Sequence, residues 1–208
     1  MERRDFIKTT ALASSGLFAL KHVSPSAWAA PASSGMPYGP LGRTSVQVSK
    51  LGIGTAPLGR NNTDAPKVAR IIGKAIDEGI NYMDTAPNYS NGETERRLGH
   101  ALKGKRDQVF LITKTEADTY EGTMELLENS LKHLQTDHVD LVHIHNLGHL
   151  DRWKNLDFAF SKKGAMGALR KARQQGKVRF IGASGHLHPS RFHYAIDSGE
   201  IDVIMNAV

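Results

Sequence analysis

Apolar residues along the chain follow two patterns that alternate with one another. Short apolar runs, typical of buried strands, occur at six places, and stretches with apolar residues three or four positions apart follow five of them. The third such stretch carries Met124, Leu127, Leu131 and Leu134 on one helix face. The pattern therefore predicts five helices and six strands, the strands at 47–54, 80–83, 109–113, 139–144, 178–183 and 202–205.

The alternation of strand and helix restricts the architecture. Asp64 and Pro66 are residues typical of a helix start, and Gly79 is typical of a helix stop, so the first helix is bounded on both sides. Because each helix must carry the chain back across the sheet, the strands must run parallel. Two architectures satisfy this order, an open doubly wound sheet and an eight-stranded barrel, and the periodicity does not choose between them.

Polar side chains follow four of the predicted strands. Asp84, Lys114, His145 and Ser184 each come directly after a strand. In a barrel the carboxyl ends of the strands share one rim, where active sites are built. In an open sheet only the ends near the switch point would meet.

These residues are suited to proton transfer beside a carbonyl group. Tyr89 comes five residues after Asp84. An isolated phenol, with a pKa of about 10, is a poor acid at neutral pH, but a neighbouring ammonium such as that of Lys114 stabilises the phenolate. We expect Asp84 to hold Lys114 by an ion pair and His145 to form a hydrogen bond with a substrate carbonyl or with the phenol. Such a proton donor suits hydride transfer. The set contains no nucleophile–base pair, so covalent hydrolysis is not indicated.

Several segments together resemble the aldo/keto reductase family over residues 37–208. They are residues 51–55, 81–90 with Gly92, Glu93 and Glu95, 112–114, 139–145, and 176–184. The resemblance implies a (β/α)8 TIM barrel, a nicotinamide cofactor (NADPH, with NADH as the other candidate) and an aldehyde or ketone of small size as substrate. It implies a catalytic tetrad with Tyr89 as general acid, Ser184 on the nicotinamide carboxamide, and Thr55 and Asp84 near the nicotinamide ribose. The tetrad is Asp84, Tyr89, Lys114 and His145.

The sequence departs from the family pattern at three points. Gly185 stands where the family usually has asparagine, and Met205 or Asn206 stands where a glutamine is common. A full barrel needs about 250 residues, so we expect an incomplete barrel that lacks the family's last two β/α units. Three explanations stay open: a fragment of a longer product, a true truncation, or a barrel completed by a second chain. We expect activity of the full-length parent rather than of these 208 residues alone.

Two other functions are compatible with the same residues. The first is a metal-dependent hydrolase barrel. His143 and His145 lie two positions apart on one strand and so face the same side, and His186 and His188 follow the next strand, so the four histidines could bind zinc. The family resemblance gives His145 another role, and we assign no metal site. The second alternative is a non-catalytic cofactor-binding module, as some members of the family are regulatory subunits.

The composition is that of a globular protein and excludes some other classes of protein. With 39% apolar and 23% charged residues, the chain is globular, and it has no cysteine for disulfides or thiolate sites. Part of the net charge of +6 lies in the first 30 residues, and no dense basic block remains for nucleic acid. Nothing after residue 29 is long and apolar enough to span a membrane.

The first 29 residues resemble a signal peptide of the twin-arginine export route. Arg3 and Arg4 precede Phe-Ile-Lys, a 12-residue apolar run extends over 9–20, and Ala27-Trp28-Ala29 offers small residues for cleavage. We expect recognition by the export machinery and a periplasmic or exported protein that is cytoplasmic before export. The alternative is an amphipathic N-terminal helix or a retained anchor. Residues 30–40 are predicted to be a linker, and 41–208 a partial barrel domain.

Overall fold

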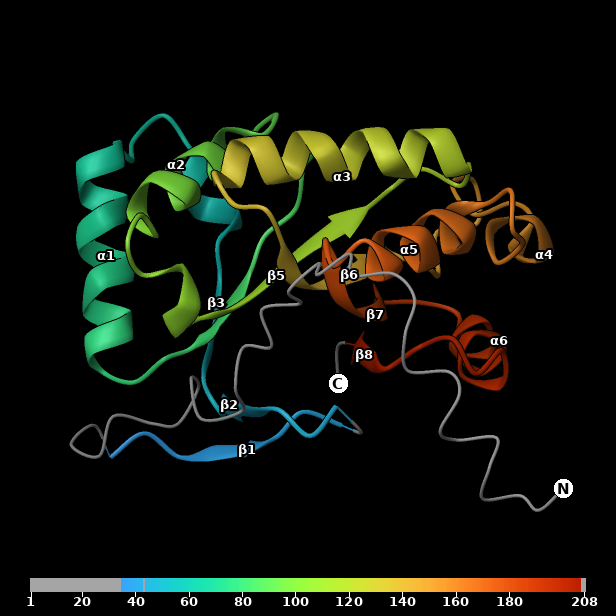
Figure 1. Ribbon diagram of the computed structural model, residues 1–208, viewed down its shortest axis with the longest axis horizontal. Helices are drawn as coiled ribbons and strands as arrows, with labels where there is room; N and C mark the ends of the chain where they lie inside the picture. The colour runs from blue at the N-terminus through green and yellow to red at the C-terminus, as the bar shows by residue number, and fades with distance from the viewer. Residues whose placement is uncertain (1–34, 43, 207–208) are drawn as a thin grey trace, which may run out of the picture.

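The computed structural model describes residues 35–42 and 44–206. The predicted signal peptide at 1–29 and the first part of the predicted linker lie outside these residues. Within them the chain forms a curled sheet covered by helices on its outer side (Figure 1).

Six parallel strands form the sheet, and they lie side by side in the order in which they occur along the chain. A doubly wound sheet reverses its strand order at a switch point, whereas this sheet does not, so the observed order is that of a barrel. Within the described chain, the first and last of these strands each pair with a single neighbour. The strands are β3 (Gly52–Gly54), β4 (Tyr82–Asp84), β5 (Phe110–Thr115), β6 (Val139–Ile144), β7 (Val178–Gly185) and β8 (Val203–Asn206).

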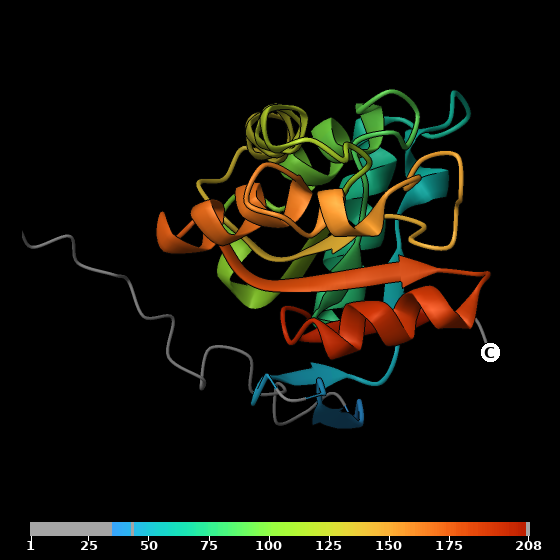
Figure 2. The ribbon, with the colours of Figure 1, turned by 90° about the vertical axis from the view of Figure 1, so that its right-hand side faces the viewer.

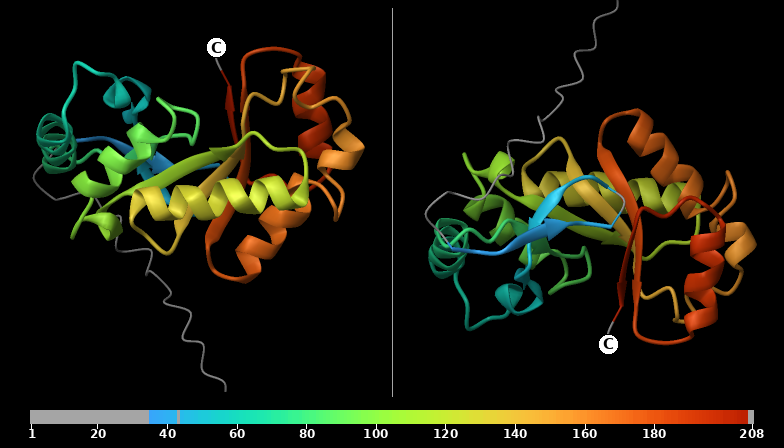
Figure 3. Two further views of the ribbon diagram at one scale, coloured as in Figure 1. Left: turned by 90° about the horizontal axis from the view of Figure 1, so that it is seen from above. Right: turned by 90° about the horizontal axis from the view of Figure 1, so that it is seen from below.

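Helices connect the strands and lie on one side of the curled sheet (Figures 2 and 3). Asp64 caps the first helix by accepting a hydrogen bond from the Lys67 backbone N–H, and Gly79 beyond its end has a φ of 85°, as the sequence predicts for a start and a stop. No helix in the described ranges has the length and apolar character needed to cross a membrane. The helices are η2 (Ala56–Gly59), α1 (Ala65–Asp77), α2 (Glu93–Ala101), η3 (Arg106–Gln108), α3 (Tyr120–Leu134), α4 (Leu156–Ala159), α5 (Ala165–Gln174) and α6 (Pro189–Asp197).

The N-terminal strand prediction needs a correction. The single strand expected at 47–54 is two strands, because β2 (Gln47–Ser49) pairs antiparallel with β1 (Tyr38–Pro40) and only β3 joins the parallel sheet. The predicted linker therefore ends before residue 38 rather than at residue 40. Ser49 and Asn81 fix this hairpin to the sheet, since the Ser49 backbone N–H donates to Asn81 Oδ1 (2.7 Å) and the Asn81 backbone N–H donates to Ser49 Oγ (3.1 Å).

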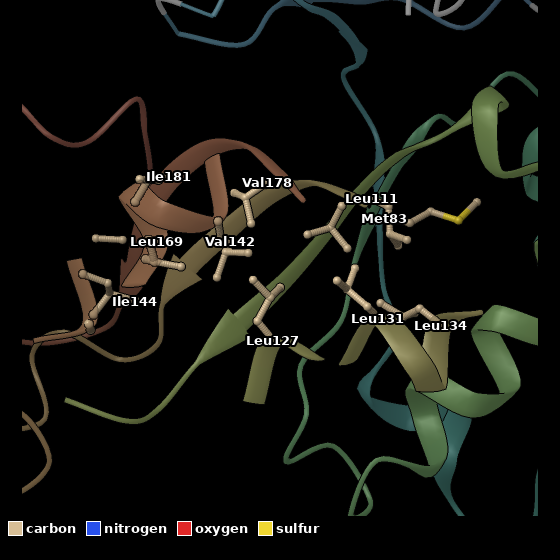
Figure 4. Packing of buried hydrophobic residues seen from close by; sticks show 14 of the residues in the cluster. Met83, Leu111, Leu127, Leu131, Leu134, Val142, Ile144, Leu169, Val178 and Ile181 are labelled. Carbon is tan, nitrogen blue, oxygen red and sulfur yellow. The ribbon is translucent and has the colours of Figure 1, made fainter. Parts of the chain in front are cut away.

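Two apolar layers cover the two faces of the sheet. The outer layer lies between strands and helices, where Leu111, Val142 and Ile181 face residues of α3 and α5 such as Leu127 and Leu169 (Figure 4). The inner layer is smaller and includes Phe110, Ile112, Leu141 and Val203, with Val46 and Val48 of the hairpin packed against them. Because side chains alternate along a strand, the same inner face carries the residues that follow at the carboxyl ends.

Carboxylates join neighbouring strands at two places, one of them buried (Asp140) and one half-buried (Asp202). Asp140 Oδ2 accepts from the Leu111 backbone N–H (2.8 Å) and from Arg106 Nη2 (2.8 Å). Asp202 Oδ2 accepts from the Ile181 backbone N–H (2.8 Å) and also pairs with an arginine of α5. Each carboxylate ties one strand to the next, so the relative heights of the strand ends are fixed.

Candidate active site

The structure brings the four predicted tetrad residues to one end of the sheet. Asp84 is the last residue of β4, Lys114 lies one residue before the end of β5, and His145 directly follows β6. Tyr89 lies in the connection from β4 to α2. β5 and β7 run further than the sequence predicts, so Lys114 and Ser184 lie within strands rather than after them, and the pleat directs their side chains.

Lys114 is the centre of this group. Its side chain is only 1% exposed. Its Nζ donates to Asp84 Oδ2 (2.6 Å), to the Thr85 carbonyl oxygen (2.7 Å) and to the Tyr89 hydroxyl oxygen (3.2 Å). An ammonium has three N–H donors, so every donor of this buried charge has an acceptor.

The Asp84 carboxyl group is under two opposing influences. Burial raises its pKa, and the ion pair with Lys114 lowers it, with burial the larger effect. One oxygen binds Lys114, while the other, Oδ1, is buried and has no hydrogen-bond partner among the described residues. The carboxyl group therefore holds the lysine and keeps an unused acceptor in the site.

Tyr89 has the geometry of a proton donor. Its hydroxyl oxygen accepts a hydrogen bond from Lys114, so the hydroxyl proton can be given to another group. The Lys114 ammonium also lies 4.8 Å from the centre of the Tyr89 ring. This positive charge stabilises the negative charge that remains on the phenol oxygen after proton transfer.

His145 lies against the edge of the tyrosine ring. The two ring centres are 6.2 Å apart and the rings are nearly perpendicular, at 83°. Burial, and electrostatic repulsion from Lys114, Arg152 and the His186 side chain, lower the pKa of His145 to about 3, so the His145 imidazole is neutral at pH 7.

Two contacts of His145 were not anticipated from the sequence. Its Nδ1 lies 2.7 Å from Glu116 Oε1, and its carbonyl oxygen accepts a hydrogen bond from Trp153 Nε1 (2.8 Å). Glu116 follows Lys114 by two residues, which is the only local signal that could have pointed to it.

The residues predicted to hold a cofactor lie at the same end. Ser184 is buried, and its Oγ has no partner in the described chain. Thr55 is fully buried and donates from Oγ1 to the Asp84 carbonyl oxygen (2.9 Å), so its hydroxyl joins β3 to β4. Unsatisfied buried polar atoms are rare in folded proteins, and Ser184 Oγ and Asp84 Oδ1 together fit a polar ligand group at this rim.

The histidines of the metal-dependent alternative do not form a ligand cluster. His143 is fully buried against Gly182, neither ring nitrogen has a partner among the described residues, and burial lowers its pKa to about 3. His186 and His188 are exposed. In residues 35–42 and 44–206, no three histidine or acidic side chains are placed to hold a metal ion together.

Comparison with known proteins gives a consistent family match. The model of the aldo/keto reductase family matches residues 50–208. The aldo-keto reductase YhdN of Bacillus subtilis is 34% identical over 164 residues, which cover 72% of this chain and 47% of that protein. The L-galactose dehydrogenase of Arabidopsis thaliana is 33% identical over 183 residues, covering 80% of this chain and 54% of the relative. The chain thus spans about half the length of these curated relatives.

Solved structures share the fold. The holo form of aldo-keto reductase AKR11C1 from Bacillus halodurans superposes with a TM-score of 0.70 at 29% identity, over 83% of this chain and 58% of that one. An aldo/keto reductase from Klebsiella pneumoniae, solved in complex with NADP and acetate, superposes with a TM-score of 0.64 at 25% identity, over 79% and 56% of the two chains. The curled six-stranded sheet is therefore part of a (β/α)8 barrel.

Proposed function

The chain belongs to the aldo/keto reductase family, and we propose that the protein is an NAD(P)H-dependent oxidoreductase that reduces aldehyde or ketone groups of small molecules. One observation carries this proposal: a single buried ammonium, Lys114 Nζ, contacts both the Asp84 carboxylate and the Tyr89 hydroxyl. This arrangement provides the proton donor that carbonyl reduction requires.

We assign the proton transfer to Tyr89. The phenol gives its proton to the substrate oxygen, and Lys114 stabilises the phenolate that is left. Asp84 holds Lys114 in place, since the ammonium would otherwise be buried without a counter-ion. The neutral His145 packs against the tyrosine ring and limits its orientations.

We propose NADPH as the cofactor, with NADH as the alternative. A bound nicotinamide supplies the hydride for the reduction. The unsatisfied Ser184 Oγ fits a hydrogen bond with the carboxamide, and Thr55 and Asp84 would lie near the ribose. The Klebsiella structure solved with NADP supports the choice of cofactor.

We also propose that the protein is exported by the twin-arginine route and acts in the periplasm or outside the cell. The support is the sequence of residues 1–29, with its paired Arg3 and Arg4 and its small residues at 27 and 29. That route carries folded proteins, which suits an enzyme that binds its cofactor before export.

Replacing Tyr89 by phenylalanine in the full-length parent protein tests the proposed reaction. Tyr89→Phe removes the proton donor and little volume, so kcat should fall by about two to four orders of magnitude, while NADPH binding, measured by fluorescence titration, stays nearly unchanged. Tyr194→Phe is the matched control, because it removes a phenol that binds Asp157 on the outer side of the molecule.

Two results would overturn the proposal. Normal turnover of Tyr89→Phe would exclude the phenol as proton donor. A full-length parent protein that binds NADPH but reduces no carbonyl compound would be a non-catalytic cofactor-binding module.

A further inference from the structure

The turn between Tyr89 and α2 contains the sequence Asn91-Gly92. Three consecutive residues in this turn, Ser90, Asn91 and Gly92, have positive φ angles of 50°, 53° and 80°. This left-handed region admits glycine freely and asparagine more readily than most residues with a side chain. A Cβ on Gly92 would also lie 2.9 Å from His133 Cε1. The turn therefore requires glycine at position 92 and favours asparagine at position 91.

An asparagine followed by glycine is a chemically reactive pair. The backbone nitrogen of the second residue can attack the side-chain carbonyl carbon of the first, and glycine has no side chain to hinder the approach. Asn91 is the one asparagine in the sequence that glycine follows.

Both reacting groups are free in the folded chain. The backbone carbonyl of Asn91 accepts from Arg96 Nη1 (3.3 Å), but within the described residues its side chain makes no hydrogen bond and the Gly92 N–H donates to no acceptor. Asn91 is exposed and lines a surface hollow of about 580 Å³, so water reaches its side chain. No hydrogen bond of either group has to break before they react.

Two other asparagines lack this freedom. Asn146 has nearly the same φ, 52°, but the N–H of the following Leu147 donates to a carbonyl oxygen of β7 (2.8 Å). Asn88 donates from Nδ2 to Glu116 (2.6 Å), and the following Tyr89 N–H donates to a carbonyl oxygen of the same loop (3.2 Å). In both cases a hydrogen bond must break before the backbone nitrogen can attack.

We propose that Asn91 is a site of spontaneous covalent modification in the folded protein, where asparagine is converted to a mixture of aspartate and isoaspartate. The Gly92 nitrogen forms a bond with Asn91 Cγ, the bond from Cγ to Nδ2 breaks, and Nδ2 leaves as ammonia with the proton of the Gly92 amide. Water then opens the succinimide ring. Breaking the new bond to Cγ gives aspartate, and breaking the original peptide bond gives isoaspartate.

The isoaspartate form lengthens the loop that carries Tyr89. Its backbone runs through the side chain of residue 91, which inserts one more backbone atom into the turn. The turn is closed by the N–H groups of Glu93 and Thr94, which donate to carbonyl oxygens on its other side (3.1 and 3.4 Å), and the longer backbone strains both bonds. Isoaspartate at position 91 therefore displaces the Tyr89 hydroxyl from Lys114, a consequence for turnover that rests on the proposed function.

Mass spectrometry of tryptic peptides tests the modification without any turnover. The folded protein is incubated at pH 7, and electron-transfer fragmentation locates the conversion and identifies isoaspartate. The modified fraction at Asn91 should exceed that at Asn88 and at Asn146 by roughly tenfold or more, since hydrogen bonds must break at those two positions. Asn91→Gln is the matched variant and should show no conversion, because glutamine has to close a larger and less favourable ring.

Two results would overturn the modification site. One is equal conversion at all three asparagines of the folded protein. The other is conversion of Asn91 only after guanidinium chloride has unfolded the protein, since the turn would then protect the pair.

The displacement of Tyr89 is tested by ageing the full-length parent protein. Its kcat for a carbonyl substrate should fall in proportion to the isoaspartate fraction, whereas Asn91→Gln should keep its kcat over the same incubation. Protein isoaspartyl methyltransferase with S-adenosylmethionine, which returns isoaspartate to aspartate, should restore the lost kcat.

The possible outcomes separate this inference from the proposed function. Full turnover of protein that contains isoaspartate overturns the displacement of Tyr89 and leaves the proposed function intact. If the fresh parent protein reduces no carbonyl compound, the proposed function fails and the consequence for turnover fails with it, whereas the mass spectra still decide the modification.

Discussion

The buried ion pair between Asp84 and Lys114 predicts that losing one charge is worse than losing both. Asp84→Asn keeps the size of the side chain and an oxygen that faces Lys114 Nζ, but it removes the negative charge. The lysine side chain is 1% exposed and the aspartate side chain 12%, so water cannot replace the lost partner. The perturbation thus leaves a buried ammonium held only by neutral oxygens.

The size of the effect follows from these contacts. Breaking a buried ion pair by removing one partner destabilises a protein by about 3–5 kcal/mol. Lys114 retains the Thr85 carbonyl and the Tyr89 hydroxyl as acceptors, so we expect the lower end, about 3 kcal/mol. Asp84→Asn with Lys114→Met removes both charges, and we expect the double variant to lose only about 1 kcal/mol.

Urea unfolding at pH 7 measures the loss of stability of the single and the double variant. An unchanged m-value shows that unfolding exposes the same surface in the variants as in the wild type. Glu78→Gln is the control, because it breaks an exposed lysine–glutamate pair at the C-terminal end of α1 and should leave the midpoint unchanged. The reasoning is refuted if the double variant is less stable than Asp84→Asn. The charge of Asp84 would then not be what holds Lys114.

Two further predictions concern pH and export. His143 and His145 have pKa values lowered to about 3 in the folded protein from an ordinary 6.5, so below pH 6.5 the unfolded chain takes up protons that the native state does not, and stability falls as the pH falls. His143 alone contributes about 1.4 kcal/mol to the free energy of unfolding per pH unit. Urea unfolding between pH 6 and 5 should therefore show a smaller change of this free energy with pH in His143→Gln than in the wild type, and an unchanged one in His193→Gln, which replaces an exposed histidine. Equal pH dependence in all three proteins would contradict the prediction. Replacing Arg3 and Arg4 together by lysine should reduce the periplasmic fraction of the protein at least several-fold on cell fractionation, and an unchanged fraction would exclude twin-arginine export.

The order of strands and helices could be predicted because each unit carries its own local signals. Asp64 and Gly79 bound α1 by short-range hydrogen bonding and backbone conformation, and neither depends on the rest of the fold. The hairpin of β1 and β2 could not be predicted in the same way. Its strands have three residues each, too few for a period, and they are fixed by the contact of Ser49 with the distant Asn81.

The residues of the candidate site also differ in whether local signals in the sequence could predict their positions. Asp84, Lys114 and His145 could be placed together because parallel strands end on one rim, and this requires only that each strand end be located. The partners of His145 were missed for the opposite reason. Glu116 reaches the ring and Trp153 reaches the backbone carbonyl from loops, and loop positions depend on contacts that no sequence period records.

The register of the sheet explains why the strand ends suffice to build the site. Asp140 holds the Leu111 backbone N–H and thereby fixes β5 against β6, and Lys114 is then the register partner of His143, with the Thr115 carbonyl accepting from the His145 N–H (2.9 Å). A slip of one residue would turn Lys114 to the helix side of the sheet. It would also replace it on the inner face by a threonine, which cannot stabilise a phenolate. The buried Asp140 carboxylate near the amino end of β6 therefore determines which side chain of β5 stands in the site at the carboxyl end.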